Sequence, residues 1–241
     1  MTSRDEWLAR TFVDLADTLV SDFDLVEFLS LLTERCGLLL GDVDVGLMLV
    51  DASGSARLMA TSNERMVVVE LFEIQADEGP CIDTYRSGRP HVNLDLAEVD
   101  DRWPQVAPKA RTAGYRRTHA LPMRLRERII GAVNILDPVD RELDLTNLAI
   151  AQSMADVATI GILQRWAIEQ ATELAQQLQT ALNSRVVIEQ AKGIVAEKLH
   201  VSIPEAFEIL RSHARNASRR LSDVAQVVIA GRLPAAGLVH S

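Results

Sequence analysis

The stretch from residue 144 to residue 182 contains no proline and keeps a helical spacing of apolar side chains throughout. A helix this long exceeds most globular helices, so it divides the chain into an N-terminal and a C-terminal part. Its apolar residues recur at steps of three and four: Ile160, Leu163, Ala167, Ala171, Leu174, Leu178 and Ala181. Such a narrow stripe is typical of a coiled coil, and we expect residues 144–182 to form a coiled-coil connector. Gln170 and Gln177 occupy seam positions and count against a coiled coil, and a helix buried in a core is the alternative.

The N-terminal part, residues 1–143, changes its period several times. Helical spacing over residues 5–40 gives way to alternating apolar residues over 43–51 and 56–62, which predict a hairpin. After it we expect a helix at 66–75, a loop-rich stretch at 76–108, a short helix at 105–113, and strands at 116–125 and 129–138. Antiparallel strands mixed with helices predict an α+β domain, with helices packed against a central antiparallel sheet.

The C-terminal part is expected to contain three short helices. The first covers residues 182–199, and the second begins at Ser202-Ile-Pro-Glu205, a capping box with proline in the first turn. The third ends before Gly231. We expect residues 183–233 to form a three-helix bundle and residues 234–241 to be disordered. The seam of this bundle is expected to contain Ile188, Val195, Phe207 and Leu210.

Charge is distributed unevenly along the chain. The net charge is −9, yet from residue 183 onward eight Lys and Arg stand against five Asp and Glu, a local charge of +3. Residues 1–182 therefore carry −12. A basic end on an acidic chain favours a polyanionic partner for the C-terminal part.

Three motifs of the expected bundle occur in a recognisable order. SRVVIEQAKGIVAEKL spans residues 184–199, EAFEILRSHAR spans 205–215 and LSDVAQVV spans 221–228. Together they resemble the ANTAR domain, an RNA-binding module of transcription antitermination. The resemblance implies a three-helix ANTAR bundle that binds paired hairpins in nascent mRNA and so prevents a terminator from forming. It also implies a homodimer, held here through residues 144–182.

The N-terminal part carries a second resemblance. EGPCIDTYRSGRPHVNLDL (78–96), DDRWPQVAPKARTAGYRR (100–117) and LPMRLRERIIGAVNIL (121–136) are similar to segments of a GAF domain. This resemblance implies a GAF-like sensor domain over residues 1–143 that controls the RNA-binding part. Its ligand would be an unknown small molecule, or the domain would bind none.

Several residues of the expected bundle are candidates for RNA contact: Arg185, Gln190, Ala191, Lys192, Gly193, Arg211, Arg215, Arg219 and Arg220. Arg211 and Arg215 lie four residues apart, so they share one helix face. Guanidinium groups stack on unpaired bases and bind phosphates, and small residues beside Lys192 let an RNA backbone approach closely. The alternative is a solvated arginine face, with the small residues needed only for helix packing.

Four residues are candidates for a sensor pocket: Cys81, Trp103, Tyr115 and His119. Cys81 follows Gly-Pro, where a helix can begin, and a helix N-terminus lowers the pKa of a thiol. This pattern allows a redox role for Cys81, with a buried packing cysteine as the alternative. Aromatic residues make up only 4% of the chain and no histidine has a second ligand beside it, so no cofactor or metal is predicted.

Known catalytic motifs are missing from the chain, which predicts a regulator rather than an enzyme. No apolar run is long enough for a membrane span, and two cysteines give no disulfide framework, so we expect a cytoplasmic protein. Two other functions remain open at this point. The bundle can dock a partner protein as a signalling switch, or bind DNA as three short helices with a turn do.

Overall fold

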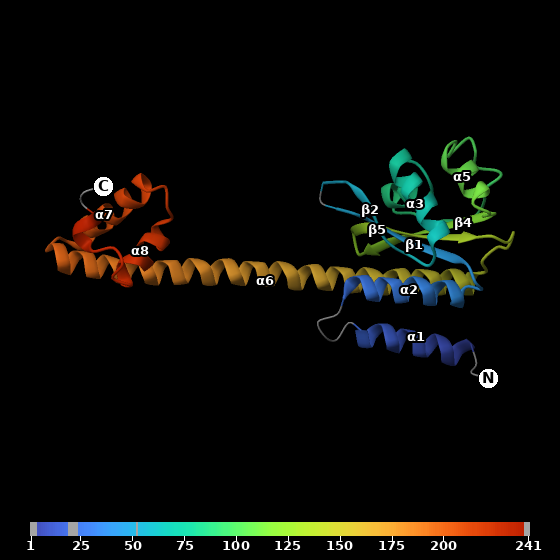
Figure 1. Cartoon of the computed structure of the whole chain (residues 1–241). Helices are drawn as coiled ribbons and strands as arrows, with labels where there is room; N and C mark the ends of the chain where they lie inside the picture. The colour runs from blue at the N-terminus through green and yellow to red at the C-terminus, as the bar shows by residue number, and fades with distance from the viewer. Residues whose placement is uncertain (1–3, 19–23, 52, 239–241) are drawn as a thin grey trace. The chain divides into compact units, whose positions relative to one another are not determined.

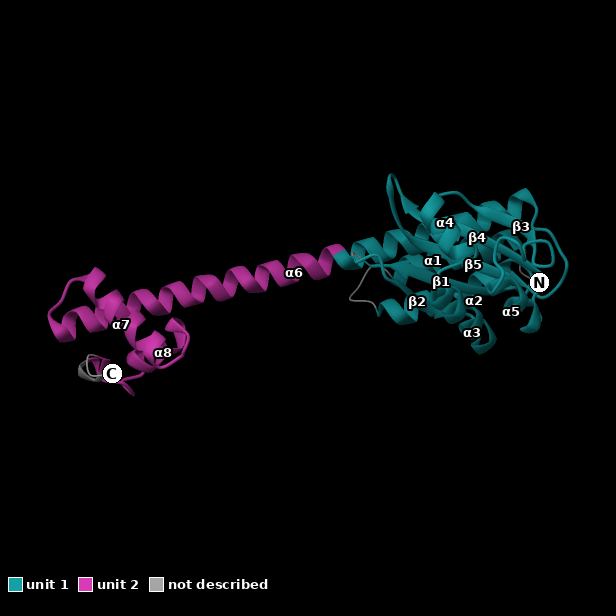
Figure 2. Ribbon diagram, turned by 90° about the horizontal axis from the view of Figure 1, so that it is seen from above, with its two compact units in different colours: residues 1–166 teal, residues 167–241 magenta. Residues whose placement is uncertain are grey.

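The computed structural model describes residues 4–18, 24–51 and 53–238, which form two compact units, Met1–Trp166 and Ala167–Ser241 (Figure 2). The first unit is built around one antiparallel sheet (Figure 1). Its strands are β1 (Asp44–Val50), β2 (Ala56–Thr61), β3 (His91–Asp95), β4 (Arg117–Leu125) and β5 (Arg128–Asp137), in the spatial order β2-β1-β5-β4-β3. Every neighbouring pair runs antiparallel, as the sequence predicts.

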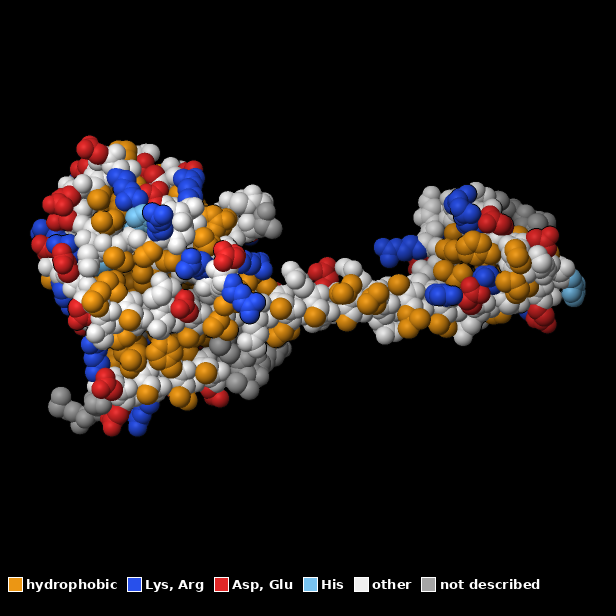
Figure 3. Space-filling view, turned by 180° about the vertical axis from the view of Figure 1, so that it is seen from behind, with side chains coloured by type: hydrophobic (Ala, Val, Ile, Leu, Met, Phe, Trp, Pro, Cys, Tyr) orange, Lys and Arg blue, Asp and Glu red, His pale blue; other side chains and the backbone are white. Residues whose placement is uncertain are grey.

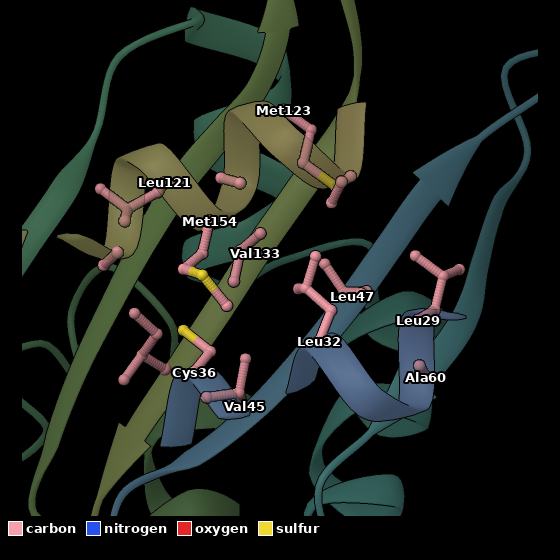
Figure 4. Packing of buried hydrophobic residues seen from close by; sticks show 14 of the residues in the cluster. Leu29, Leu32, Cys36, Val45, Leu47, Ala60, Leu121, Met123, Val133 and Met154 are labelled. Atoms are coloured by element: carbon pink, nitrogen blue, oxygen red, sulfur yellow. The ribbon is translucent and has the colours of Figure 1, made fainter. Parts of the chain in front are cut away.

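One face of the sheet is covered by α2 (Leu25–Leu39), and α1 (Arg4–Thr18) packs on the outer side of α2 (Figure 1). Asp24 caps α2, because its carboxylate accepts the backbone N–H groups of Val26 and Glu27. Alternate residues of a strand point to opposite faces, so Val45 and Leu47 of β1 face this layer. Figure 4 shows them packed beside α2 and the start of the long helix, with labelled side chains Leu29, Leu32, Cys36, Val45, Leu47, Ala60, Leu121, Met123, Val133 and Met154.

The other face is covered by α3 (Glu64–Ala76), α4 (Pro80–Ser87) and α5 (Val106–Thr112). Gly114 follows α5 with φ of 93°, a conformation that glycine adopts readily. The stretch 76–108, expected to be loop-rich, contains both α4 and β3. An eight-residue helix and a five-residue strand are too short to establish a period, so hydrophobic spacing missed them.

The long helix α6 runs without interruption from Leu145 to Leu199. The separate helix expected from residue 182 is therefore the last part of α6. Its first part packs on the sheet through Ile150, Met154 and Ile162, which lie in the same core as α2. Alanines between them let the helix approach the strands closely. The sequence assigns residues 144–182 entirely to the connector, whereas in the structure this first part belongs to the sensor unit.

The second unit is the expected three-helix bundle. The end of α6 packs with α7 (Ile203–Asn216) and α8 (Leu221–Ile229) around Ala191, Val195 and Leu210. A short 3₁₀ helix, Ala235–Leu238, follows, and Leu238 is buried in the same cluster. The expectation of disorder from residue 234 is therefore wrong for Ala235–Leu238, because Leu238 has apolar surface to bury. Residues 239–241 lie outside the described residues.

Candidate functional sites

Helix α7 presents a row of large side chains at four-residue steps. The helix begins at the predicted capping box, in which Glu205 Oε2 accepts the Ser202 N–H at 2.8 Å. From there Phe207, Arg211 and Arg215 follow one another along one side of the helix. Both arginines are exposed. Arg211 Nη1 lies 3.3 Å from Glu208 Oε1, but both side chains are about half exposed, so this pair contributes little and leaves the guanidinium accessible.

Lys192 on α6 lies beside the start of this row. Its ammonium is 5.6 Å from the centre of the Phe207 ring, a cation–π contact between two helices. Glu189 also accepts a hydrogen bond from Lys192 Nζ at 2.8 Å. Only 15% of the Lys192 side chain is exposed. The structure therefore brings Lys192 and the α7 arginines to one side of the bundle, with Lys192 held in place and the arginines extended.

Phe207 differs from the sequence-based expectation. It was expected in the seam, but the ring is only partly buried and lies outside the apolar cluster of the bundle. Val195 and Leu210 are in that cluster, as predicted. Helical spacing does not distinguish a position in the centre of the apolar face from one at its margin, and Phe207 lies at the margin. Phe207 is the one aromatic side chain that the described part of the bundle contains.

The other candidate RNA residues divide into exposed and buried positions. Four charged or polar candidates are exposed beside Lys192 and after α7: Arg185, Gln190, Arg219 and Arg220. Ala191 is fully buried in the bundle core, so its small size serves helix packing and its side chain cannot touch a ligand. Gly193 is exposed, and a Cβ there would meet no heavy atom within 4 Å. Its missing side chain therefore leaves open surface.

The sensor candidates lie on both faces of the sheet. Cys81 at the start of α4 and the pair Trp103 and Tyr115 are buried on the face covered by α3, α4 and α5. Trp103 Nε1 donates to Asp83 Oδ2 at 3.1 Å, and the Tyr115 hydroxyl donates to Asp44 Oδ2 at 2.6 Å. His119 follows Thr118, whose side chain meets Asn134 on that same face, so His119 points to the opposite side. The four candidates therefore do not line one pocket.

Comparison with known proteins agrees with these arrangements. A family model of the GAF domain matches residues 24–162, more than half of the chain. The chain belongs to the GAF family. A second model, of the ANTAR domain, matches residues 176–229, so the chain also carries an ANTAR domain. The ANTAR match begins inside the uninterrupted part of α6, earlier than the bundle boundary expected at residue 183.

Solved structures share the fold of the GAF domain at low sequence identity. A GAF domain of a phosphoenolpyruvate-protein phosphotransferase from Coxiella burnetii superposes with a TM-score of 0.52 at 16% identity, over 70% of this chain and 99% of that one. Free methionine-R-sulfoxide reductase from Neisseria meningitidis gives 0.52 at 19% identity, over 68% and 91%. The GAF domain of an Acinetobacter phosphotransferase gives 0.50 at 12%, over 66% and 95%. No curated protein matches the chain.

Burial determines the protonation of the candidate sensor residues Cys81 and His119 in the GAF domain. It raises the pKa of the Cys81 thiol well above the ordinary value, and the nearby Glu73 and Glu70 raise it further. The effect of burial on the thiol pKa therefore exceeds the opposite effect of the helix N-terminus, and a free thiolate at Cys81 is disfavoured. Burial, together with the positive charges of Arg117 and Arg141, lowers the pKa of His119 to about 4. His119 is neutral at pH 7, with Nδ1 accepting the Asn93 N–H at 2.9 Å.

The GAF domain also contains a buried polar cluster that sequence reasoning missed. Glu70 and Glu73 of α3 are both fully buried against Asn134 of β5. Burial raises the pKa of Glu70 to about 7, and burial with the charge of Glu70 raises the pKa of Glu73. A signal was present, because Met66, Val69, Glu70 and Glu73 occupy one face at helical spacing. Glutamates on an apolar helix face should have marked the site.

Within the described residues, no helix is both long and apolar enough to cross a bilayer.

Proposed function

We propose that this protein is an RNA-binding transcription antitermination regulator whose ANTAR domain binds paired hairpins in nascent mRNA under the control of its GAF domain. The observation that carries the proposal is the exposed row of Arg211 and Arg215, flanked by Lys192 and Phe207, in an ANTAR domain. Binding to the hairpins would hold the transcript in a form that excludes the terminator. The protein would act by binding alone, without a catalytic step.

The chemistry of this surface suits folded RNA with unpaired loops. Arginine guanidinium groups contact phosphates and stack on loop bases, and a partly exposed aromatic ring adds a stacking surface for one base. Phe207 supplies such a ring, while Lys192, whose ammonium lies 5.6 Å from the ring centre, supplies a fixed positive charge. Arg219 and Arg220, in the connection to α8, extend the basic surface toward a second strand or hairpin.

We propose further that two copies pair through α6. Residues 167–183 are exposed in every position, and Leu174 and Leu178 are 57% and 63% exposed. Figure 3 shows hydrophobic side chains on the surface of this part of the helix. A helical stretch that packs against nothing is only marginally stable in water. Apolar residues at steps of three and four form a stripe that a second copy of the same helix can cover in a coiled coil.

The decisive experiment measures binding of the full chain to a two-hairpin RNA at several salt concentrations. Arg211→Ala and Arg215→Ala should each weaken binding by about 1–3 kcal/mol and make the salt dependence shallower. Arg124→Ala, which removes an exposed arginine of the GAF domain, is the charge-matched control and should bind normally.

Three results would contradict this function. Arginine variants that bind normally but melt early would make these side chains structural. A wild-type chain without RNA affinity at low salt would favour a protein-docking switch, and preference for duplex DNA over hairpin RNA in competition would favour a DNA-binding regulator.

A further inference from the structure

The buried polar cluster of the GAF domain brings together side chains that bind metal ions. Glu70 and Glu73 lie on α3, one turn apart, and Cys81 lies at the start of α4. All three are fully buried, and a carboxylate oxygen of each glutamate and the Cys81 Sγ lie within 4.8 Å of one another. These residues come from segments that meet only because both helices pack on the same face of the sheet.

The hydrogen bonds of the cluster leave one oxygen without a partner. Glu73 Oε1 accepts the Cys81 N–H at 2.6 Å, and Glu73 Oε2 accepts from Asn134 Nδ2 at 3.2 Å. Asn134 Nδ2 also donates to Glu70 Oε1 at 2.7 Å. Glu70 Oε2 is buried and has no hydrogen-bond partner among the described residues. A buried carboxylate oxygen in this position is costly unless a cation or a proton occupies it.

Two glycines give the carboxylates their room. A Cβ at Gly46 of β1 would lie 2.8 Å from Glu70 Oε1, and a Cβ at Gly79 would lie 2.5 Å from Glu73 Oε1. The backbone conformation of Gly46 is one that any residue can adopt, so the lack of space for a Cβ is the reason that a glycine stands at this position. The surrounding backbone is therefore shaped around two acids in a core where apolar side chains would otherwise pack.

We propose that Glu70, Glu73 and Cys81 together bind one divalent transition-metal ion of the Zn²⁺ class inside the GAF domain. Metal–oxygen bonds near 2.1 Å and metal–sulfur bonds near 2.3 Å require the three atoms to converge by about 1 Å. When the ion binds, the thiol of Cys81 and any carboxyl group of Glu70 or Glu73 that carries a proton lose these protons to solvent. Three protein ligands leave a fourth tetrahedral position for water or a small sensed molecule.

The ligand set selects among cations. A thiolate is a soft ligand that suits zinc, cobalt or ferrous iron, whereas Mg²⁺ and Ca²⁺ prefer oxygen ligands alone. Asn134 donates to both carboxylates and so orients them, as outer partners of metal ligands do. The inference goes beyond the proposed RNA binding and does not depend on it, because every residue involved lies in the GAF domain.

The test uses the full chain, stripped of metal by a chelator and titrated with Zn²⁺ and with Co²⁺. We expect one ion per chain, and a thiolate-to-cobalt charge-transfer absorption in the Co²⁺ form. Cys81→Ser should abolish this absorption. Glu70→Gln, which keeps the shape of the side chain and removes a buried charge, should weaken Zn²⁺ binding about tenfold or more.

Cys36→Ser is the matched control, because Cys36 is equally buried but lies on the opposite face of the sheet. It should retain both the absorption and the affinity. A Glu70→Gln chain that stays folded by circular dichroism and binds Zn²⁺ as tightly as wild type would overturn the proposal. So would a wild-type chain that binds no Zn²⁺, because Glu70 would then simply hold a proton.

Discussion

At the scale of single residues, Phe207 has a different role from the one that its spacing suggests. The ring lies under Lys192 at the edge of the bundle, while Leu210 is fully buried. Phe207→Ala should therefore weaken binding of hairpin RNA, through a lost stacking surface, by about 1–3 kcal/mol. Leu210→Ala should instead destabilise the bundle by about 2–5 kcal/mol. Melting curves and RNA titrations of both variants test this division, and a Phe207→Ala bundle that unfolds would return the ring to the seam.

His119 should make the stability of the GAF domain depend on pH. Its pKa falls from 6.5 to about 4 on folding, mainly through burial. Between these values the unfolded chain binds a proton at His119 that the folded chain does not, so His119 lowers the free energy of unfolding as the pH is lowered. Its contribution from pH 7 to pH 5 is a decrease of about 2 kcal/mol. Glu70, whose pKa is raised to about 7 by burial, contributes in the opposite direction, so the effect of His119 is the difference between wild type and a His119 variant.

Urea unfolding at the two pH values measures this dependence. His119→Asn, whose side chain does not titrate, should lack this contribution, so its change in stability between the two pH values should differ from that of wild type by about 2 kcal/mol. Equal pH dependence in the two proteins would mean that His119 is solvated in the folded state.

At the scale of elements, the exposed middle of α6 is the part of the molecule that most needs a partner. Replacing Leu174 and Leu178 with glutamate should turn a dimer into monomers, because two like charges would be buried at each seam. Gln176→Glu together with Gln179→Glu adds the same charge on the opposite side of the helix and is the control. Sedimentation of the three proteins tests the pairing. A wild-type chain that is monomeric even with RNA present would refute it.

At the scale of the whole molecule, the two units have separate apolar cores. The core of the GAF domain contains Leu47 and Ile135, whereas the bundle is built around Val195 and Leu210. The exposed stretch between them, residues 167–183, has no core of its own. Cooperative unfolding of the entire chain is therefore not expected.

Calorimetry should resolve two thermal transitions. Leu210→Ala should lower the midpoint of one, and Leu47→Ala the midpoint of the other, because each cavity forms in one core only. Midpoints that move together in both variants would show that the units are energetically coupled.

Local patterns were sufficient to predict the order of most elements, and the structure confirms the antiparallel sheet, the capping box at Ser202 and the bundle. These features depend on neighbouring residues in the chain, such as the alternation in β1 or the reach of Glu205 back to Ser202. The ANTAR and GAF motifs were visible for the same reason, because each is a short run with fixed spacing.

Tertiary packing decided what local patterns leave open. The apolar stripe of α6 does not by itself determine what covers it. The first part of the helix packs on the strands, whereas Leu174 and Leu178 stay exposed. Ala191 is a packing residue because α7 and α8 cover it. Glu70, Glu73 and Cys81 meet only because α3 and α4 pack on one face, where burial changes the chemistry of all three. Spacing along a chain determines which residues share an element, but burial and proximity between elements arise only when the sheet and its helices assemble.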